Sequence, residues 1–182
     1  MLGTVARGTT AAERPWGLNG DPAAWARPLG IAMLRQDLRL LEVSTSGEGF
    51  TDLTAEINRQ ITASGVDQGV ATLVCLHTSC SLTINENADP RVLHDLSAYL
   101  RALVPQVGFR SLGGEGERRL YAHDDEGPDD MPAHIRTALT ATSLQLSVQG
   151  GRLLLGTWQA VYLWEHRARG QHRRLSLHLI GA

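Results

Sequence analysis

The sequence predicts a single compact α+β domain in which a large, mostly antiparallel sheet is covered by a few helices. Two observations favour this fold class. Segments with the pattern of strands outnumber segments with the pattern of helices, and the C-terminal part of the chain is rich in strand-like segments. The length of 182 residues and the hydrophobic content of 42% also suit one domain with a substantial core rather than two domains.

The chain divides by composition into residues 1–33 and residues 34–182. The first segment is rich in Gly, Ala, Pro, Thr and Arg, and its apolar residues follow no regular period. Such a segment is typical of a flexible or surface-docked extension. We therefore expect residues 34–182 to form the folded domain.

Apolar periodicity predicts the elements of this domain. Helices are expected over 50–63, from Asp89 to just before Pro105, and over about 131–141. Strands are expected over 35–45, from 70 onward, and over 143–148, 152–155, 157–166 and 173–180.

The charge balance excludes some classes of function. The net charge is −2 and the sequence pI is about 6.4, so no overall positive field favours binding to nucleic acid. No stretch approaches the length of a membrane-spanning helix, and the N-terminus lacks the apolar run of a signal peptide. We expect a cytoplasmic protein that binds neither nucleic acid nor membrane.

Polar residues directly follow an apolar, β-branched strand that starts at Val70. If this strand continues without a break, its period of two places Cys75, His77, Ser79 and Ser81 on one face. Cys80 then lies on the opposite face from Cys75, so the two cysteines cannot bridge within the strand and are expected to be reduced structural thiols; Cys75 as a nucleophile is the minor alternative. The same strand leads to Asn85, Glu86 and Asn87, which indicates a polar site near one strand end.

An acidic loop provides a second group of polar residues. Five of the seven residues from Asp124 to Asp130 are acidic, and His123 and His134 flank them. Together with His77, these two histidines predict a zinc-type site with three imidazole ligands and an open fourth position. If oxygen ligands from Glu126, Asp129 or Asp130 dominate, magnesium bridging to a phosphate is the alternative. A solvated loop without a metal is the third interpretation.

The C-terminal hairpin carries basic and aromatic residues. Arg173 and Arg174 could bind phosphate or pyrophosphate, although charged hairpin tips are commonly just solvated. Glu165 and His166 should point to opposite faces of their strand. Trp158, Tyr162 and Trp164 share the face of His166, where they could form core, a subunit interface or a platform for a planar ring.

Three motifs resemble the YjbQ family, part of which is described as secondary thiamine-phosphate synthase. They are HTSCSLTINENADPRVLHDL, HDDEGPDDMPAHIRTAL and GRLLLGTWQAVYLWEHR, followed by a pair of arginines. The resemblance covers about residues 35–182 and implies a compact α+β fold, a homotrimer and sites near subunit boundaries. Cys80 stands where the family commonly has a small residue such as alanine.

The resemblance also implies roles for individual residues. Catalytic roles fall on His77, Asn85, Glu86, His134, Glu165 and His166. Substrate-binding roles fall on Ser79, Asn87, Trp158, Arg173 and Arg174, and metal-binding roles fall on His77, His123, His134 and Glu126.

The implied reaction joins hydroxymethylpyrimidine pyrophosphate to a thiazole phosphate and releases pyrophosphate. This chemistry needs stabilisation of the departing charge, to which a divalent metal ion, zinc or magnesium, and the hairpin arginines could contribute. One alternative is a metal-dependent hydrolase or transferase that acts on another small phosphorylated metabolite. A second alternative is a trimeric metal- or metabolite-binding protein without turnover.

Overall fold

The computed structural model describes residues 33–110 and 116–182. The extension predicted over 1–33 therefore lies outside the described residues, apart from Met33. Among the described residues no helix is both long and apolar enough to span a membrane.

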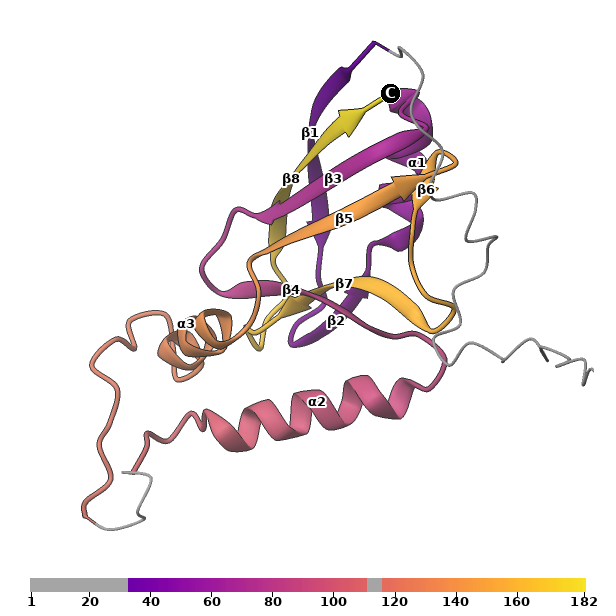
Figure 1. Ribbon diagram of the computed structural model, residues 1–182. Coiled ribbons are helices and arrows are strands. Elements are labelled where there is room, and N and C mark those ends of the chain that lie inside the picture. The colour runs from indigo at the N-terminus through magenta and orange to yellow at the C-terminus, as the bar shows by residue number, and fades with distance from the viewer. Residues whose placement is uncertain (1–32, 111–115) are drawn as a thin grey trace, which may run out of the picture.

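The fold is a single α+β domain, as the sequence predicted, with two antiparallel sheets and three helices in the described part (Figure 1). The larger sheet has the strand order β1-β8-β3-β5-β6, and the smaller has the order β2-β7-β4. The strands are β1 (Arg35–Ser44), β2 (Gly49–Asp52), β3 (Gln68–Cys75), β4 (Cys80–Glu86), β5 (Ser143–Gln149), β6 (Arg152–Leu153), β7 (Gln159–Glu165) and β8 (His172–Gly181).

The hydrophobic core lies between the inner faces of the two sheets. Strands β1, β3 and β8 contribute alternate residues such as Leu41, Leu73 and Leu177, as the period of two requires. Helix α1 (Thr54–Ser64) closes this core with Ile57 and Ile61, both fully buried. The segment Gly49–Asp52 is a strand, β2, so the helix predicted over 50–63 begins four residues later than expected.

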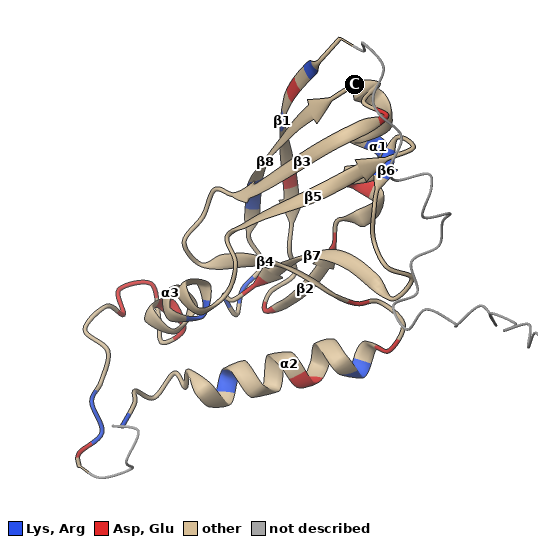
Figure 2. Cartoon of the chain, in the orientation of Figure 1, with Lys and Arg blue, Asp and Glu red and all other residues tan. Residues whose placement is uncertain are grey.

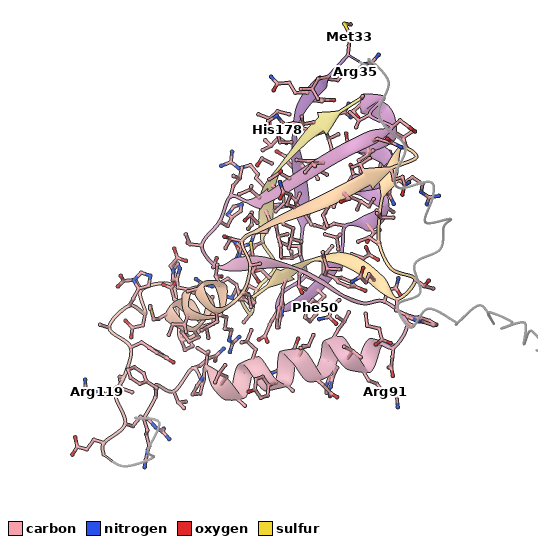
Figure 3. The ribbon with its side chains drawn as sticks, in the orientation of Figure 1. Met33, Arg35, Phe50, Arg91, Arg119 and His178 are labelled. Carbon is pink, nitrogen blue, oxygen red and sulfur yellow. The ribbon has the colours of Figure 1, made fainter. Side chains whose placement is uncertain are left out.

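Helix α2 (Pro90–Leu103) lies against the outer side of the smaller sheet (Figure 1). It begins where the sequence predicted, because Asp89 accepts a hydrogen bond from the Arg91 amide and Pro90 occupies the first turn. Phe50 of β2 lies between this sheet and α2 (Figure 3). Its ring stacks on Trp164 with centroids 4.5 Å apart, so Trp164 is part of the interior and is not available as a platform for a substrate ring.

The predicted continuous strand from Val70 through Ser81 is wrong. The chain leaves β3 after Cys75 and enters the other sheet at Cys80, so residues 76–79 are a loop between strands of different sheets. The prediction that Cys75 and Cys80 point to opposite faces is therefore also wrong. Their sulfur atoms face each other at 3.2 Å across the junction, and both residues are buried free thiols.

Candidate functional site

Three segments meet at one polar cavity of about 340 Å³. They are the loop 76–79 between β3 and β4, the acidic loop before α3 (Asp130–Leu139), and the start of the connection after β7. Figure 2 shows the acidic segment immediately before α3. The cavity is lined by Leu76, His77, Thr78, Ser79, His123, Glu126, Asp130, His134 and Arg167.

Two histidines and one aspartate converge on a single point in this cavity. The Nε2 atom of His123 lies 3.3 Å from Asp130 Oδ2, and the Nε2 atom of His134 lies 3.4 Å from Asp130 Oδ1. One ligand atom of each residue lies within 4.8 Å of those of the other two. The two imidazole rings remain open to solvent, with side chains 52% and 31% exposed, whereas the carboxylate beneath them is 1% exposed.

Local structure explains how Asp130 and His134 come together. They are four residues apart in α3, so they lie on the same face of the helix. The Nδ1–H of His134 donates to the Thr78 carbonyl at 3.0 Å, which fixes the tautomer and leaves the Nε2 lone pair facing the cavity. A backbone oxygen in this position is a common orienting partner for a metal-binding imidazole.

The buried guanidinium of Arg167 forms ion pairs with the acidic loop that precedes α3. Its guanidinium donates to Asp129 Oδ2 at 3.1 Å, to Glu126 Oε2 at 3.0 Å and to Asp130 Oδ1 at 2.7 Å. Burial raises the pKa of Asp129, but a hydrogen bond from the Ala168 amide and the Arg167 charge outweigh burial, so the pKa is below its usual value. The Arg167 side chain thus balances part of the negative charge of the loop, and solvent contacts the exposed side chain of Glu126.

His77 lines the same cavity but is not part of the converging group. Its Nε2 accepts a hydrogen bond from the Arg174 amide at 2.8 Å, so that nitrogen is not free to bind a metal. Burial and the charges of Arg173 and Arg174 lower its pKa, which keeps the imidazole neutral. The predicted set of three imidazoles therefore differs from the observed group, in which Asp130 stands in the place expected for His77. Glu126, also predicted as a ligand, is paired with Arg167.

Other predicted site residues lie in the interior. Glu165 is fully buried and forms an ion pair with Arg173, which also donates to Ser79 Oγ at 3.1 Å. Arg173 is consequently a buried counter-ion and is not a free phosphate ligand. The Nε2 of His166 lies 2.8 Å from Ser81 Oγ, and burial lowers its pKa to about 3.

The remaining predicted residues lie elsewhere. Asn85 and Glu86 are at the far end of β4 from the loop 76–79, and Asn87 and Trp158 are exposed just beyond the strands. The side-chain oxygen of Asn85 accepts a hydrogen bond from the Glu86 amide, and the side-chain amide of Asn87 donates to the Gln159 carbonyl. The backbone amide of Arg174 donates to His77, which does line the cavity. Within one chain, these residues do not line the cavity.

The sequence did not single out Asp130 and Arg167. Asp130 was one of three acidic candidates, and its spacing of four from His134 on a helix was the signal that could have distinguished it. Arg167 was grouped with the other arginines of the hairpin. No local sequence pattern separates a buried arginine from its exposed neighbours there.

Comparison with known proteins decides the family. A family profile described as "UPF0047 protein YjbQ-like" matches residues 39–182. A UPF0047 protein of Synechocystis sp. is 45% identical over 150 residues, which cover 82% of this chain and 95% of the relative. The chain belongs to the YjbQ (UPF0047) family. The YjbQ protein of Escherichia coli O157:H7 is 41% identical over 144 residues, covering 79% of this chain and 96% of that protein.

Solved YjbQ-like structures share the fold. A YjbQ/UPF0047 protein of Clostridium acetobutylicum matches with a TM-score of 0.64 at 31% identity, covering 78% of this chain and 98% of that chain. A conserved hypothetical protein of Thermus thermophilus also matches with a TM-score of 0.64, at 33% identity and with coverage of 78% and 98%. The likeness spans nearly the full length of both solved chains, so the α+β domain described here is the fold of this family.

Proposed function

We propose that this YjbQ-family protein is a metal-dependent enzyme that acts on a small phosphorylated metabolite. The observation that carries the proposal is the convergence of His123, Asp130 and His134 on one point in the wall of a polar cavity. Two imidazoles and one carboxylate form a donor set that suits zinc or a related transition metal and leaves coordination positions open. Magnesium is less suited, because it prefers oxygen ligands.

The surroundings of this donor set support a bound cation. Asp130 is held by Arg167 and His134 by the Thr78 carbonyl, so two of the three ligands are already oriented. His77 and the Ser79 hydroxyl line the same cavity and supply neutral hydrogen-bonding groups for a substrate. A metal ion bound here would provide Lewis-acid stabilisation of negative charge on the substrate.

The family resemblance adds a specific reaction to this proposal: formation of thiamine monophosphate with release of pyrophosphate. In this scheme His123, Asp130 and His134 would hold the cation, and the cation would stabilise the negative charge of the departing pyrophosphate, a role for which Arg173 is not free because it is paired with Glu165. Hydrolysis or transfer on another phosphorylated metabolite is the second candidate. This second candidate is favoured because Arg167 is paired with Asp130 and Arg173 with Glu165. Among the described residues that line the cavity, no unpaired arginine is therefore available to bind pyrophosphate.

The experiment is a turnover assay on the purified chain after removal of metal by a chelator. Thiamine monophosphate formation is measured from the two precursors, and phosphate release is measured from a panel of phosphorylated metabolites, with zinc, manganese or magnesium added back. Asp130→Asn should abolish metal-dependent turnover, whereas the exposed Asp95→Asn on α2 is the matched control and should retain it. Full activity of metal-free protein would contradict the proposal. Tight metal binding without turnover of any substrate would favour the non-catalytic binding protein.

The proposal includes a homotrimer located in the cytoplasm. Support for association comes from the outer face of the larger sheet, where Leu38, Leu40, Val70 and Ile180 are exposed on β1, on β3 and on β8, the strand between them. Contiguous apolar residues on a sheet face are typical of a surface that contacts another protein chain, and a further copy of this chain is the occupant we propose. The two unbridged cysteines suit a reducing compartment.

A further inference from the structure

Cys75 and Cys80 are placed as a pair by the crossing of the chain from one sheet to the other. Cys75 ends β3 and Cys80 begins β4, and their sulfur atoms are 3.2 Å apart. A disulfide has a sulfur–sulfur distance of about 2.05 Å, so the two atoms need to approach by only roughly 1.2 Å. We propose that Cys75 and Cys80 are an oxidative modification site, at which hydrogen peroxide converts the two thiols into a disulfide that changes the loop 76–79.

The two thiols differ in a way that assigns their roles. Cys75 is 6% exposed and Cys80 is fully buried, so Cys75 is the residue of the pair that lies nearer to solvent. A hydrogen bond from Cys80 lowers the pKa of Cys75 to about 7 despite its burial, whereas the bond to Cys75 and burial raise the pKa of Cys80. This difference supports Cys75 as the attacking thiolate and Cys80 as the protonated partner.

The reaction balances with peroxide as the oxidant. The Cys75 thiolate attacks one oxygen of hydrogen peroxide, the O–O bond breaks, and a sulfenic acid and hydroxide form. The Cys80 sulfur then attacks the Cys75 sulfur. The S–O bond breaks, and the departing oxygen takes the Cys80 proton and leaves as water. The two sulfur atoms are oxidised by two electrons in total, and the peroxide is reduced.

The disulfide would act on the loop that forms one wall of the candidate site. The Cys75 sulfur lies 3.8 Å from the carbonyl oxygen of His77 and 3.5 Å from that of Cys80, so the single thiol proton can be donated to only one of them, and a disulfide leaves no proton for either. The next residue of the loop, Thr78, accepts the hydrogen bond that orients His134. Closing the loop therefore disturbs an orienting partner of a proposed ligand. Losses of that kind reduce metal affinity by about ten- to a hundredfold.

The first test is independent of the proposed function. The reduced, metal-free full chain is treated with hydrogen peroxide, and intact mass and peptide mapping are followed over time. We expect the loss of two hydrogens per chain, a crosslink between Cys75 and Cys80, and full reversal by a dithiol. Cys80→Ser is the matched control and should instead stop at a sulfenic acid on Cys75 that dimedone traps. If the wild-type chain crosslinks only after denaturation, or the folded chain passes to sulfinic acid without a crosslink, the proposal is wrong.

The second test measures the effect on the loop, and its last part rests on the proposed function. Amide hydrogen exchange over 76–79 should differ between the reduced and the crosslinked chain, and zinc affinity should fall at least about tenfold on crosslinking. A crosslink with unchanged exchange in the loop would refute the coupling. If the exchange changes but the reduced chain does not bind zinc, the proposed metal site fails and the modification site stands.

Discussion

Asp130 organises the candidate site at the scale of single residues. Its carboxylate lies within 3.4 Å of both imidazoles and accepts from Arg167 at 2.7 Å. From the sequence alone it was possible to infer that His123 and His134 converge, because both flank one short acidic loop. The sequence could not show that the Arg174 amide donates a hydrogen bond to His77 Nε2. This contact depends on how the ends of the strands are brought together by the whole fold.

Arg167 is expected to stabilise the protein because it compensates two buried carboxylates. Replacing it by methionine leaves Asp129 and Asp130 without their counter-charge in the interior. We expect Arg167→Met to lower the free energy of unfolding by about 3–5 kcal/mol, measured by urea denaturation.

The control for this change is Arg91→Met, which removes an exposed arginine on α2 that pairs with Asp89. It should leave the free energy of unfolding nearly unchanged, because ion pairs in solvent contribute little. Equal effects of the two substitutions would show that the Arg167 cluster does not contribute to stability.

His166 should make stability depend on pH. Burial lowers its pKa to about 3 in the folded chain, below the value of about 6.5 for an unfolded histidine. Between these two values the unfolded chain binds the extra proton, so the free energy of unfolding decreases as the pH falls below about 6.5. The expected slope from this residue is up to about 1.4 kcal/mol per pH unit.

The pH prediction is checked by urea denaturation of the wild type and His166→Gln at several values between about pH 4 and pH 7. The glutamine variant cannot take up this proton, and all other titrating groups are common to both chains. Its stability should therefore decrease less steeply with acidification. Parallel pH profiles of the two chains would mean that His166 has the same pKa in the folded and in the unfolded chain, which would contradict the prediction.

At the scale of elements, local sequence patterns predicted most helices and strands but not the turn between β3 and β4. Helix α2 was predictable because Asp89, Pro90 and a helical apolar period coincide. The loop 76–79 reads HTS after a leucine and contains neither glycine nor proline, so its residues suit a strand as well as a turn. The change of sheet there, and with it the contact between the cysteines, depends on tertiary packing.

The close approach of the paired strands β3 and β8 at Gly69 gives a prediction at the scale of elements. Gly69 pairs with Gly181, and a Cβ added at Gly69 would lie 2.2 Å from the Ile180 carbonyl oxygen. Gly69→Ala should therefore force the two strands apart and reduce the free energy of unfolding by about 1–3 kcal/mol, as measured by chemical denaturation.

Gly156 is the control, because a Cβ added there would meet a flexible side chain and no backbone atom. The nearest atom is Gln159 Oε1 at 3.3 Å, which accepts a hydrogen bond from the Gly156 amide and needs to shift by only a few tenths of an ångström. Gly156→Ala should change the free energy of unfolding by less than about 0.5 kcal/mol. If Gly69→Ala is equally mild, the two strands are less closely apposed than the structure indicates.

At the scale of the whole molecule, the larger sheet has one face packed in the core and one face that carries exposed apolar side chains in the described part of the chain. The inner face packs on the smaller sheet and on α1, whereas Leu38, Leu40 and Ile180 lie on the outer face. The sequence could not distinguish these faces in β1. Leu38, Leu40 and Leu41 are identical side chains, and only the pairing with β8 determines that Leu41 points inward.

The exposed leucines of β1 provide the test of the proposed homotrimer. Leu38 is 69% exposed and Leu40 is 55% exposed, so replacing both by glutamate should leave the core intact and introduce unpaired charges into the proposed contact between chains. We expect the solution mass to fall from that of a trimer to that of a monomer, measured by light scattering after size exclusion. Tyr99→Glu, at a site 70% exposed on α2, is the control and should keep the trimer mass. A wild-type chain that already has the monomer mass would disprove the trimer, and a double variant that remains trimeric would move the contact to another surface.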